Sequence, residues 1–162
     1  MTTSMKATAM AGIPAGEANT FIKRYLSTFS EIQEYMERTK AEARQYGYVK
    51  TLLGRKCYIP NINASNQGWR AGAERQAINA PLQGTAADIM KRAMIKIPPA
   101  LKAANLNTKM LLQVHDELIF EVPNEELEKA SALIKSIMET VVKLNVPLVA
   151  EAGSGHSWAS AH

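Results

Sequence analysis

Two apolar runs separated by a short polar break constrain the fold more than any other part of the sequence. They occupy residues 111–122 (LLQVHDELIFEV), where His115, Asp116 and Glu117 interrupt residues that favour strands. The pattern predicts a β-hairpin whose tight turn displays two adjacent carboxylates. These carboxylates could bind a divalent cation, and the alternative is a solvated turn that only joins two strands.

The N-terminal part of the chain predicts a helical lobe followed by another hairpin. Apolar residues recur at helical spacing in residues 18–29 and 30–46, and Gly47 is expected to end the second helix. After Gly47 the pattern changes to short β-prone runs on either side of Gly54, which favours a hairpin with a glycine in its turn. A polar loop follows, and we place the lobe boundary near residue 68.

A long helix is expected over residues 71–97, because apolar residues recur there every three or four positions. Pro81 has no amide hydrogen and crowds the preceding turn, so the helix is predicted to be kinked there. The proline pair at residues 98–99 is expected to end it. Another amphipathic helix is predicted to begin after Asn124, and residues 146–152 predict a last strand.

A polar stripe is expected on the long helix, because Arg75, Asn79 and Gln83 recur every four residues. One arginine and two amides can contact phosphate, sugar and base edges without carrying a negative charge into a groove of nucleic acid. The stripe is therefore a candidate nucleic-acid surface. The alternative is a hydrophilic helix face that contacts only water.

The distribution of charge also favours an anionic partner. The formal net charge is +4, and no acidic residue lies between Glu42 and Glu74. An uninterrupted basic stretch of this kind suits phosphates, and the alternative is an ordinary soluble surface. The basic residues in the gap are Arg44, Lys50, Arg55, Lys56 and Arg70.

The remaining composition narrows the class of protein. Cys57 is the single cysteine, which excludes an internal disulfide and a thiolate-rich zinc site. No segment has membrane-spanning length, so a cytoplasmic protein without a membrane partner is expected. The predicted architecture is α+β: a helical front lobe with a β-hairpin in residues 1–68, and an antiparallel sheet flanked by helices in residues 69–162.

Several motifs follow one another along nearly the whole chain. Four of them are ERQAINAP in residues 74–81, QGTAADIMKRAM in residues 83–94, QVHDELIFEV in residues 113–122, and the ending GSGHSWASAH, and EYMERTK in residues 34–40 and GYVKTLLGR in residues 47–55 also fit. Together they resemble the C-terminal part of the bacterial DNA polymerase I group, within DNA polymerase family A. The resemblance implies that residues 1–68 correspond to the rear of the fingers and residues 69–162 to part of the palm.

The resemblance implies a role for each residue at the hairpin tip. Asp116 resembles the second catalytic aspartate of the family, which binds the magnesium ions. Glu117 is similar to the neighbouring carboxylate, a supporting metal ligand, and His115 to the residue that contacts the primer end. The implied cofactor is Mg²⁺, with two ions in the complete enzyme.

The polar stripe also matches the family. Arg75, Asn79 and Gln83 resemble residues that touch template and primer in the minor groove, where hydrogen-bond acceptors vary little among correctly paired bases. The implied partners are primer–template DNA, deoxynucleoside triphosphates and the remainder of the polymerase. Arg70 is assigned to the same DNA-binding surface.

The sequence departs from the family in two features. It has neither the first catalytic aspartate, in a DYS-type stretch, nor the fingers helix that grips the triphosphate. Nucleotidyl transfer needs carboxylates from two strands to clamp two metals, so we expect a fragment of a DNA-directed DNA polymerase that is inactive alone. The alternatives are a non-catalytic duplex DNA-binding module and a metal-dependent phosphoesterase built on Asp116, Glu117 and His115. An unpaired sheet edge also favours self-association.

Overall fold

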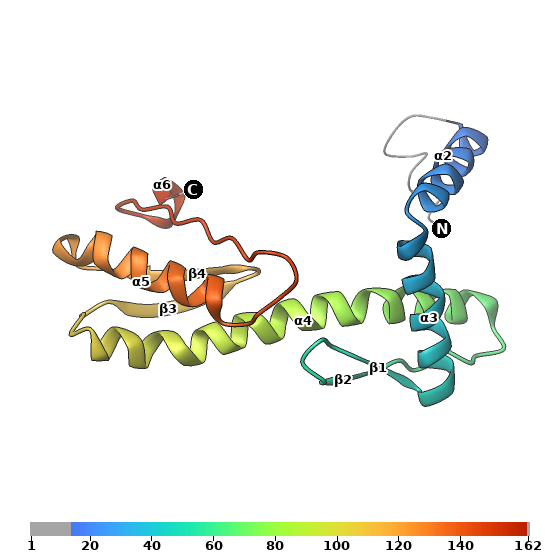
Figure 1. Ribbon diagram of the computed structural model, residues 1–162, viewed down its shortest axis with the longest axis horizontal. Helices are drawn as coiled ribbons and strands as arrows, with labels where there is room; N and C mark the ends of the chain where they lie inside the picture. The colour runs from blue at the N-terminus through green and yellow to red at the C-terminus, as the bar shows by residue number, and fades with distance from the viewer. Residues whose placement is uncertain (1–13, 162) are drawn as a thin grey trace. The chain divides into compact units, whose positions relative to one another are not determined.

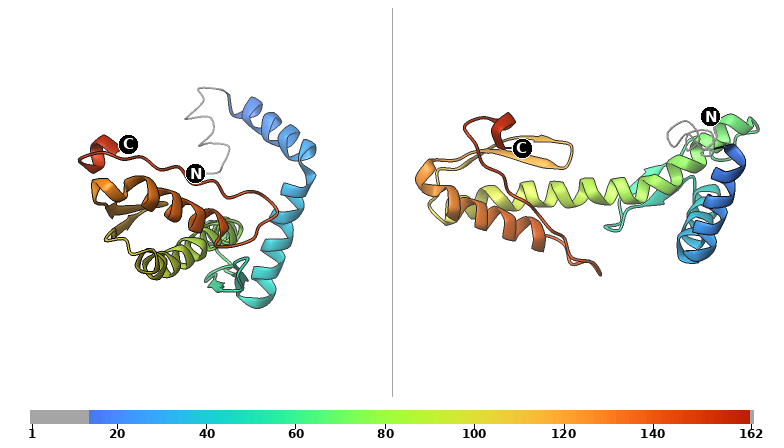
Figure 2. Two further views of the ribbon diagram at one scale, coloured as in Figure 1. Left: turned by 60° about the vertical axis from the view of Figure 1, so that its left-hand side comes forward. Right: turned by 90° about the horizontal axis from the view of Figure 1, so that it is seen from above.

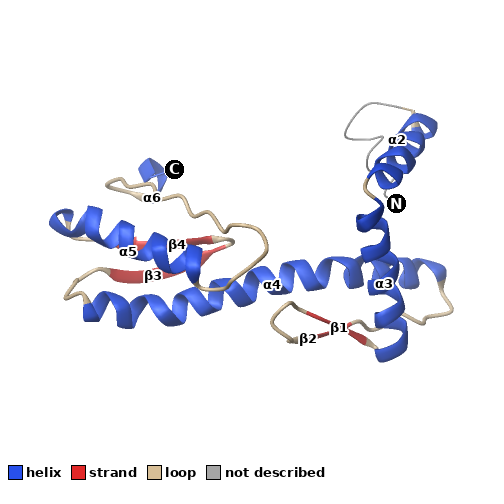
Figure 3. Ribbon diagram, viewed as in Figure 1, coloured by secondary structure: helices blue, strands red, loops and turns tan. Residues whose placement is uncertain are grey.

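The computed structural model describes residues 14–161 (Figure 1). Helices dominate this part of the chain, and its strands are short and paired as two hairpins (Figure 3). The chain divides into two compact units, one ending at Leu82 and the other beginning at Gln83, and each contains one hairpin. The predicted α+β class is confirmed. Within residues 14–161, no helix combines the length and apolarity needed to cross a membrane.

The described part of the first unit contains two consecutive helices, α2 (Ala15–Thr28) and α3 (Ser30–Tyr46). Phe29 interrupts the helical backbone between them, with φ −114° and ψ 68°. Gly47 ends α3 in the left-handed conformation (φ 74°), and its amide donates a 2.8 Å hydrogen bond to the Ala43 carbonyl. The sequence predicted both helices and the glycine that ends the second.

The first hairpin pairs β1 (Tyr48–Lys50) with β2 (Lys56–Tyr58) in antiparallel register. Gly54 lies in the connecting loop with φ 87°, a conformation that glycine adopts without steric cost. Val49 is fully buried against the core, so its neighbours on β1 point to the opposite face. The predicted hairpin and its glycine turn are confirmed.

Helix α4 (Gln67–Ala103) packs its first half into the core of the first unit. The buried cluster contains Ala43, Val49, Ile59, Ile62, Ala73 and Ala77. The Tyr35 hydroxyl on α3 also donates a 2.9 Å hydrogen bond to the Ile78 carbonyl of α4. These contacts hold the first half of α4 with the N-terminal helices, and the first compact unit accordingly extends to Leu82. The lobe boundary near residue 68 stays a prediction.

The prediction that the proline pair ends this helix is wrong, because α4 continues through Pro98 and Pro99 over a length of 37 residues. A proline removes one backbone hydrogen bond and crowds the preceding turn, at a cost of about 3 kcal/mol. Ile97 and Leu101, on either side of the pair, are both buried, and each contributes about 1.5–3 kcal/mol by burial. Their burial offsets the cost of the prolines. The kink expected at Pro81 stays a prediction.

The second unit contains a hairpin of β3 (Lys109–Val114) and β4 (Glu117–Glu121). The strands are antiparallel, with a register shift just after Met110. A short 3-10 helix, η1 (Asn124–Glu126), leads into α5 (Leu127–Thr140), which matches the helix predicted after Asn124.

One face of this hairpin packs against helices α4 and α5 of the same unit, as Figures 1 and 2 show. Leu118 and Phe120 of β4 contribute to that core, and Ile97 at its centre is fully buried. The hairpin that carries the candidate metal ligands is therefore supported along one face by two helices. The buried members of the cluster are Ala93, Ile97, Leu101 and Val141.

The last strand predicted over residues 146–152 is wrong, because this segment has no regular secondary structure. Val146 and Val149 are 65% and 74% exposed, and Pro147 has no amide to donate to a ladder. A strand also needs a neighbour, and among residues 14–161 both sheets have only two strands, neither of which includes this segment. Its Ala150 amide instead donates a 3.1 Å hydrogen bond to the Glu139 carboxylate. The chain then reaches the short helix α6 (Trp158–Ala161).

Candidate functional site

The predicted tip of the second hairpin is a two-residue turn made by His115 and Asp116. Val114 and Glu117 face each other directly across the strands, so the turn contains no further residue. His115 has φ 52°, the left-handed conformation that tight hairpin turns require and that histidine adopts more readily than most residues. The Gln113 side-chain amide donates a hydrogen bond to the His115 carbonyl and so fixes the turn.

The carboxylates at this tip are accessible. His115 and Asp116 are exposed, and Glu117, the first residue of β4, is half-buried. Asp116 therefore does not lie in an apolar core, a placement that would have excluded a metal-binding role. The turn also relaxes the strict alternation of strand side chains, which would otherwise direct neighbouring residues to opposite faces.

The donor set fits part of a magnesium site. Mg²⁺ usually binds one or two protein carboxylates and completes its shell with waters and substrate phosphates, which suits Asp116 and Glu117. Within residues 14–161, no group of three or more His, Cys, Asp or Glu residues lies close enough together to hold a metal. The hairpin tip thus presents two neighbouring carboxylates, and their role as metal ligands stays a prediction.

The predicted polar stripe is exposed along α4. Arg75, Asn79 and Gln83 are all accessible to solvent, whereas Ala73 and Ala77 on the opposite side of the helix are buried. The spacing of four residues keeps each side chain close to the next along one helix face. The first two belong to the first unit and Gln83 begins the second. The stripe offers one fixed positive charge followed by two amides that both donate and accept hydrogen bonds.

Arg70 differs from the stripe residues because part of its guanidinium is already engaged. Its Nη1 donates a 3.1 Å hydrogen bond to the Ala64 carbonyl, and the side chain is half-buried. This bond anchors the loop that precedes α4. A contact between Arg70 and DNA stays a prediction.

Glu126 positions the hairpin, a role that the sequence did not indicate. Its carboxylate accepts hydrogen bonds from the Asn107 amide at 2.9 Å and from the Thr108 amide and hydroxyl at 3.1 and 3.0 Å. The Asn107 amide, with these other donors, holds the pKa of Glu126 below its usual range. The contacts fix the backbone immediately before β3. The sequence itself offers only the acidic pair Glu125 and Glu126 directly after Asn124, where carboxylates at a helix start complement the helix dipole.

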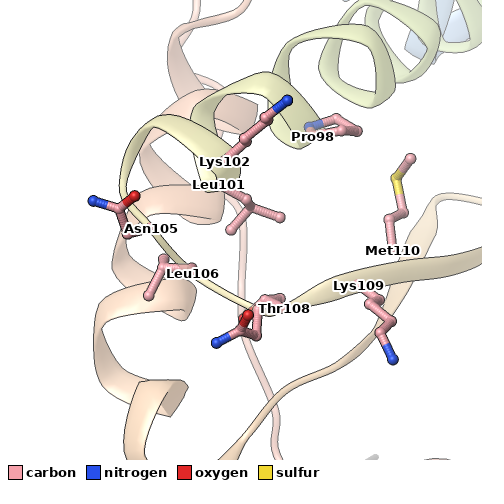
Figure 4. Close-up of a pocket in the computed structure, with 9 residues that line it drawn as sticks. Pro98, Leu101, Lys102, Asn105, Leu106, Thr108, Lys109 and Met110 are labelled. Atoms are coloured by element: carbon pink, nitrogen blue, oxygen red, sulfur yellow. The ribbon is translucent and has the colours of Figure 1, made fainter.

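A cavity of about 500 Å³ lies in the second unit, where α4 ends and β3 begins (Figure 4). Pro98, Leu101 and Met110 form part of its apolar lining, and Lys102 and Lys109 add positive charge. None of the predicted metal-binding or DNA-binding residues lines it. The candidate residues therefore lie outside this cavity, at the exposed hairpin tip of the second unit and, separately, on the exposed face of α4.

Comparison with known proteins identifies the class. The profile of DNA polymerase family A matches residues 2–160, and the chain belongs to this family. It is 46% identical to DNA polymerase I of Pseudomonas aeruginosa over 151 residues, which covers 93% of this chain and 16% of that protein. It is 48% identical to the thermostable DNA polymerase I of Thermus aquaticus over 149 residues, which covers 92% of this chain and 18% of that protein.

A solved structure supports the same fold. The POL domain of Pol1 from M. smegmatis, in complex with DNA primer-template and dNTP, matches with a TM-score of 0.92 and 40% sequence identity. The match covers 98% of this chain and 28% of that chain. This chain therefore corresponds to a portion of a bacterial family A DNA polymerase, and it spans less than one fifth of the length of the curated relatives described above.

Proposed function

We propose that this chain forms part of the fingers and palm of a DNA-templated DNA polymerase and carries one half of its nucleotidyl-transfer site. Residues 1–68 would contribute to the fingers and residues 69–162 to the palm. The observation that carries the proposal is the tight, exposed turn of the second hairpin, which holds Asp116 beside Glu117 on a supported strand pair. The proposal also places the protein in the cytoplasm, with DNA and deoxynucleoside triphosphates as partners.

Each residue of the tip has a role in this proposal. Asp116 is the principal carboxylate for Mg²⁺, Glu117 is a supporting ligand, and His115 contacts the primer end. Bound Mg²⁺ would activate the primer hydroxyl and neutralise charge on the phosphates. The protein contributes orientation, since the positive φ of His115 and the hydrogen bond from Gln113 hold the turn from which Asp116 projects.

The α4 stripe supplies the proposed contacts to primer and template. Arg75 would hold a phosphate, and Asn79 and Gln83 would donate to minor-groove acceptors, which occupy similar positions in all correct base pairs. Their exposure and common helix face support this role. Such contacts report pairing geometry without selecting a sequence.

The proposed site is incomplete within this chain. Two-metal transfer requires carboxylates from a second strand, and the sequence has neither a DYS-type stretch nor a nucleotide-gripping helix. We therefore expect no detectable primer extension by the chain alone with Mg²⁺ and nucleotides. Measured templated incorporation that Asp116→Asn abolishes would show that a further ligand exists and would refute the half-site proposal.

A complementation assay tests the positive part of the proposal. The chain is mixed with a family A polypeptide that carries the DYS-type stretch and the fingers helix. That polypeptide ends before the residues that correspond to the second hairpin, which carries Asp116. Primer extension should appear in the mixture and should disappear with Asp116→Asn. Thr20→Asn, an exposed change in α2, is the matched control and should leave extension intact. No extension in the mixture, despite demonstrated association of the two polypeptides, would contradict a catalytic role.

A second candidate function is non-catalytic binding of duplex DNA. It is favoured by the exposed α4 stripe together with the lack, within residues 14–161, of a three-ligand metal group. The complementation assay distinguishes the two functions. A binding module would bind duplex DNA through Arg75, but primer extension by the mixture would not depend on Asp116.

A further inference from the structure

The outer face of the first hairpin consists of aromatic and basic side chains. Tyr48 lies opposite Tyr58, and Lys50 lies opposite Lys56, in the antiparallel register of β1 and β2. Val49 between them is fully buried, so the four flanking side chains point away from the core. We call this set, together with Tyr46, the tyrosine–lysine face. None of these five side chains belongs to the hydrophobic core cluster of the first unit.

The rings on this face form a row. Tyr46, the last residue of α3, extends it: its ring centroid is 6.0 Å from that of Tyr48, which is 5.8 Å from that of Tyr58. The two end residues, Tyr46 and Tyr58, are 55% and 69% exposed. Exposed rings of this kind are platforms on which bases can stack. The Tyr48 ring is tilted by 34° from that of Tyr46 and by 67° from that of Tyr58, so the two end rings are not parallel and bases stacked on them would not be stacked on each other.

The lysines supply uncompensated positive charge. The Lys56 ammonium lies 4.6 Å from the centroid of the Tyr48 ring, and that of Lys50 lies 6.0 Å from it. Like charges directly opposite each other on a strand pair are destabilising. In the part of the chain that the structure describes, neither lysine forms an ion pair that would relieve this repulsion. A polyanion bound between them would relieve it.

We propose that the tyrosine–lysine face binds single-stranded DNA, with bases stacked on Tyr46 and Tyr58 and phosphates held by Lys50 and Lys56. Duplex DNA fits less well because its base faces are hidden within the stack and cannot reach the rings. The choice of DNA rests on the proposed polymerase function. Duplex DNA is proposed to bind the α4 stripe, and single-stranded DNA is here assigned to a different set of residues.

The test measures both ligand forms with the complete 162-residue chain. A labelled oligothymidine and a labelled blunt duplex are titrated separately, and binding is followed by fluorescence anisotropy. Tyr58→Leu should weaken binding of the single strand by at least about fivefold while leaving duplex binding unchanged. Tyr58→Phe keeps the ring and should retain binding. Tyr25→Leu, at another exposed tyrosine on α2, is the matched control.

The lysines are tested by salt dependence. Removal of both charges in Lys50→Ala/Lys56→Ala should reduce the salt slope for the single strand by about 1.4, at about 0.7 for each phosphate contact. Lys23→Ala/Lys143→Ala removes the same net charge at exposed positions outside this face and should leave the slope nearly unchanged. Circular dichroism establishes that each variant is folded.

The outcomes separate this inference from the proposed function. If Tyr58→Leu binds the single strand as the wild type does, or if both lysine pairs have equal effects, the inference is overturned. If duplex binding through Arg75 persists in that case, the proposed function stands. Absence of binding to both DNA forms by the wild-type chain would overturn both.

Discussion

Replacement of Pro99 by alanine should stabilise the second unit. Pro99 lies inside α4 and has no amide proton to donate to the Ile95 carbonyl one turn earlier. Proline in a helix interior lowers the free energy of unfolding by about 3 kcal/mol relative to alanine. The unfolded chain of the variant has more conformational entropy, which reduces the gain in unfolding free energy by about 0.4–1 kcal/mol. Because Pro99 is exposed, no core contact is lost. The expected gain in unfolding free energy is about 2 kcal/mol.

Urea unfolding followed by circular dichroism measures this gain as a higher midpoint. Lys96→Ala is the matched control, since Lys96 is exposed on the same helix and its replacement should change stability by less than about 0.5 kcal/mol. An unchanged or lower midpoint for Pro99→Ala would refute the reasoning. It would mean that the helical ladder does not continue past the proline pair, or that the Pro99 ring makes contacts that alanine cannot replace.

Three further predictions concern DNA, pH and association. Arg75→Ala should weaken duplex binding and reduce the magnitude of its salt slope by about 0.9, whereas Arg38→Ala, at an exposed position on α3, should not; equal slopes for the two variants would exclude a phosphate contact. Because the Asn107 amide lowers the pKa of Glu126, the stabilisation by its carboxylate is present above the unfolded-state pKa and is lost as pH falls through the folded-state pKa. Glu126→Gln should therefore lose less stability than the wild type between neutral and acidic pH in urea titrations, and identical losses would contradict this. Light scattering at increasing concentration should show self-association through the open strand edges, an idea that a constant monomer mass would remove.

The elements that the sequence predicted correctly depend on local chemistry. Gly47 ends α3 because the left-handed conformation there suits glycine, and the polar break at His115 and Asp116 interrupts two apolar strands. The short β-prone runs on either side of Gly54 were also readable, and they form β1 and β2. The exposure of Asp116 follows from the same two-residue turn.

The features that the sequence did not predict depend on contacts between distant segments. The continuation of α4 past Pro98 depends on burial of Ile97 and Leu101 against α5 and the second hairpin. The local helix-breaking tendency of proline takes no account of such burial. The role of Glu126 depends on the loop at Asn107, nineteen residues earlier, which brings four donors to one carboxylate. Residues 146–152 have strand-forming composition but lack a paired neighbour in the described chain.

One consequence of the long helix concerns cooperativity. Helix α4 contributes Ala73 and Ala77 to the hydrophobic cluster of the first unit, and Ile97 and Leu101 to that of the second unit. Because α4 is one continuous helix, the unfavourable free energy of starting a helix is incurred once. Each further residue then adds one backbone hydrogen bond to the same helix. Loss of either cluster would remove the packing from one half of α4, so the helix would fray first in that half.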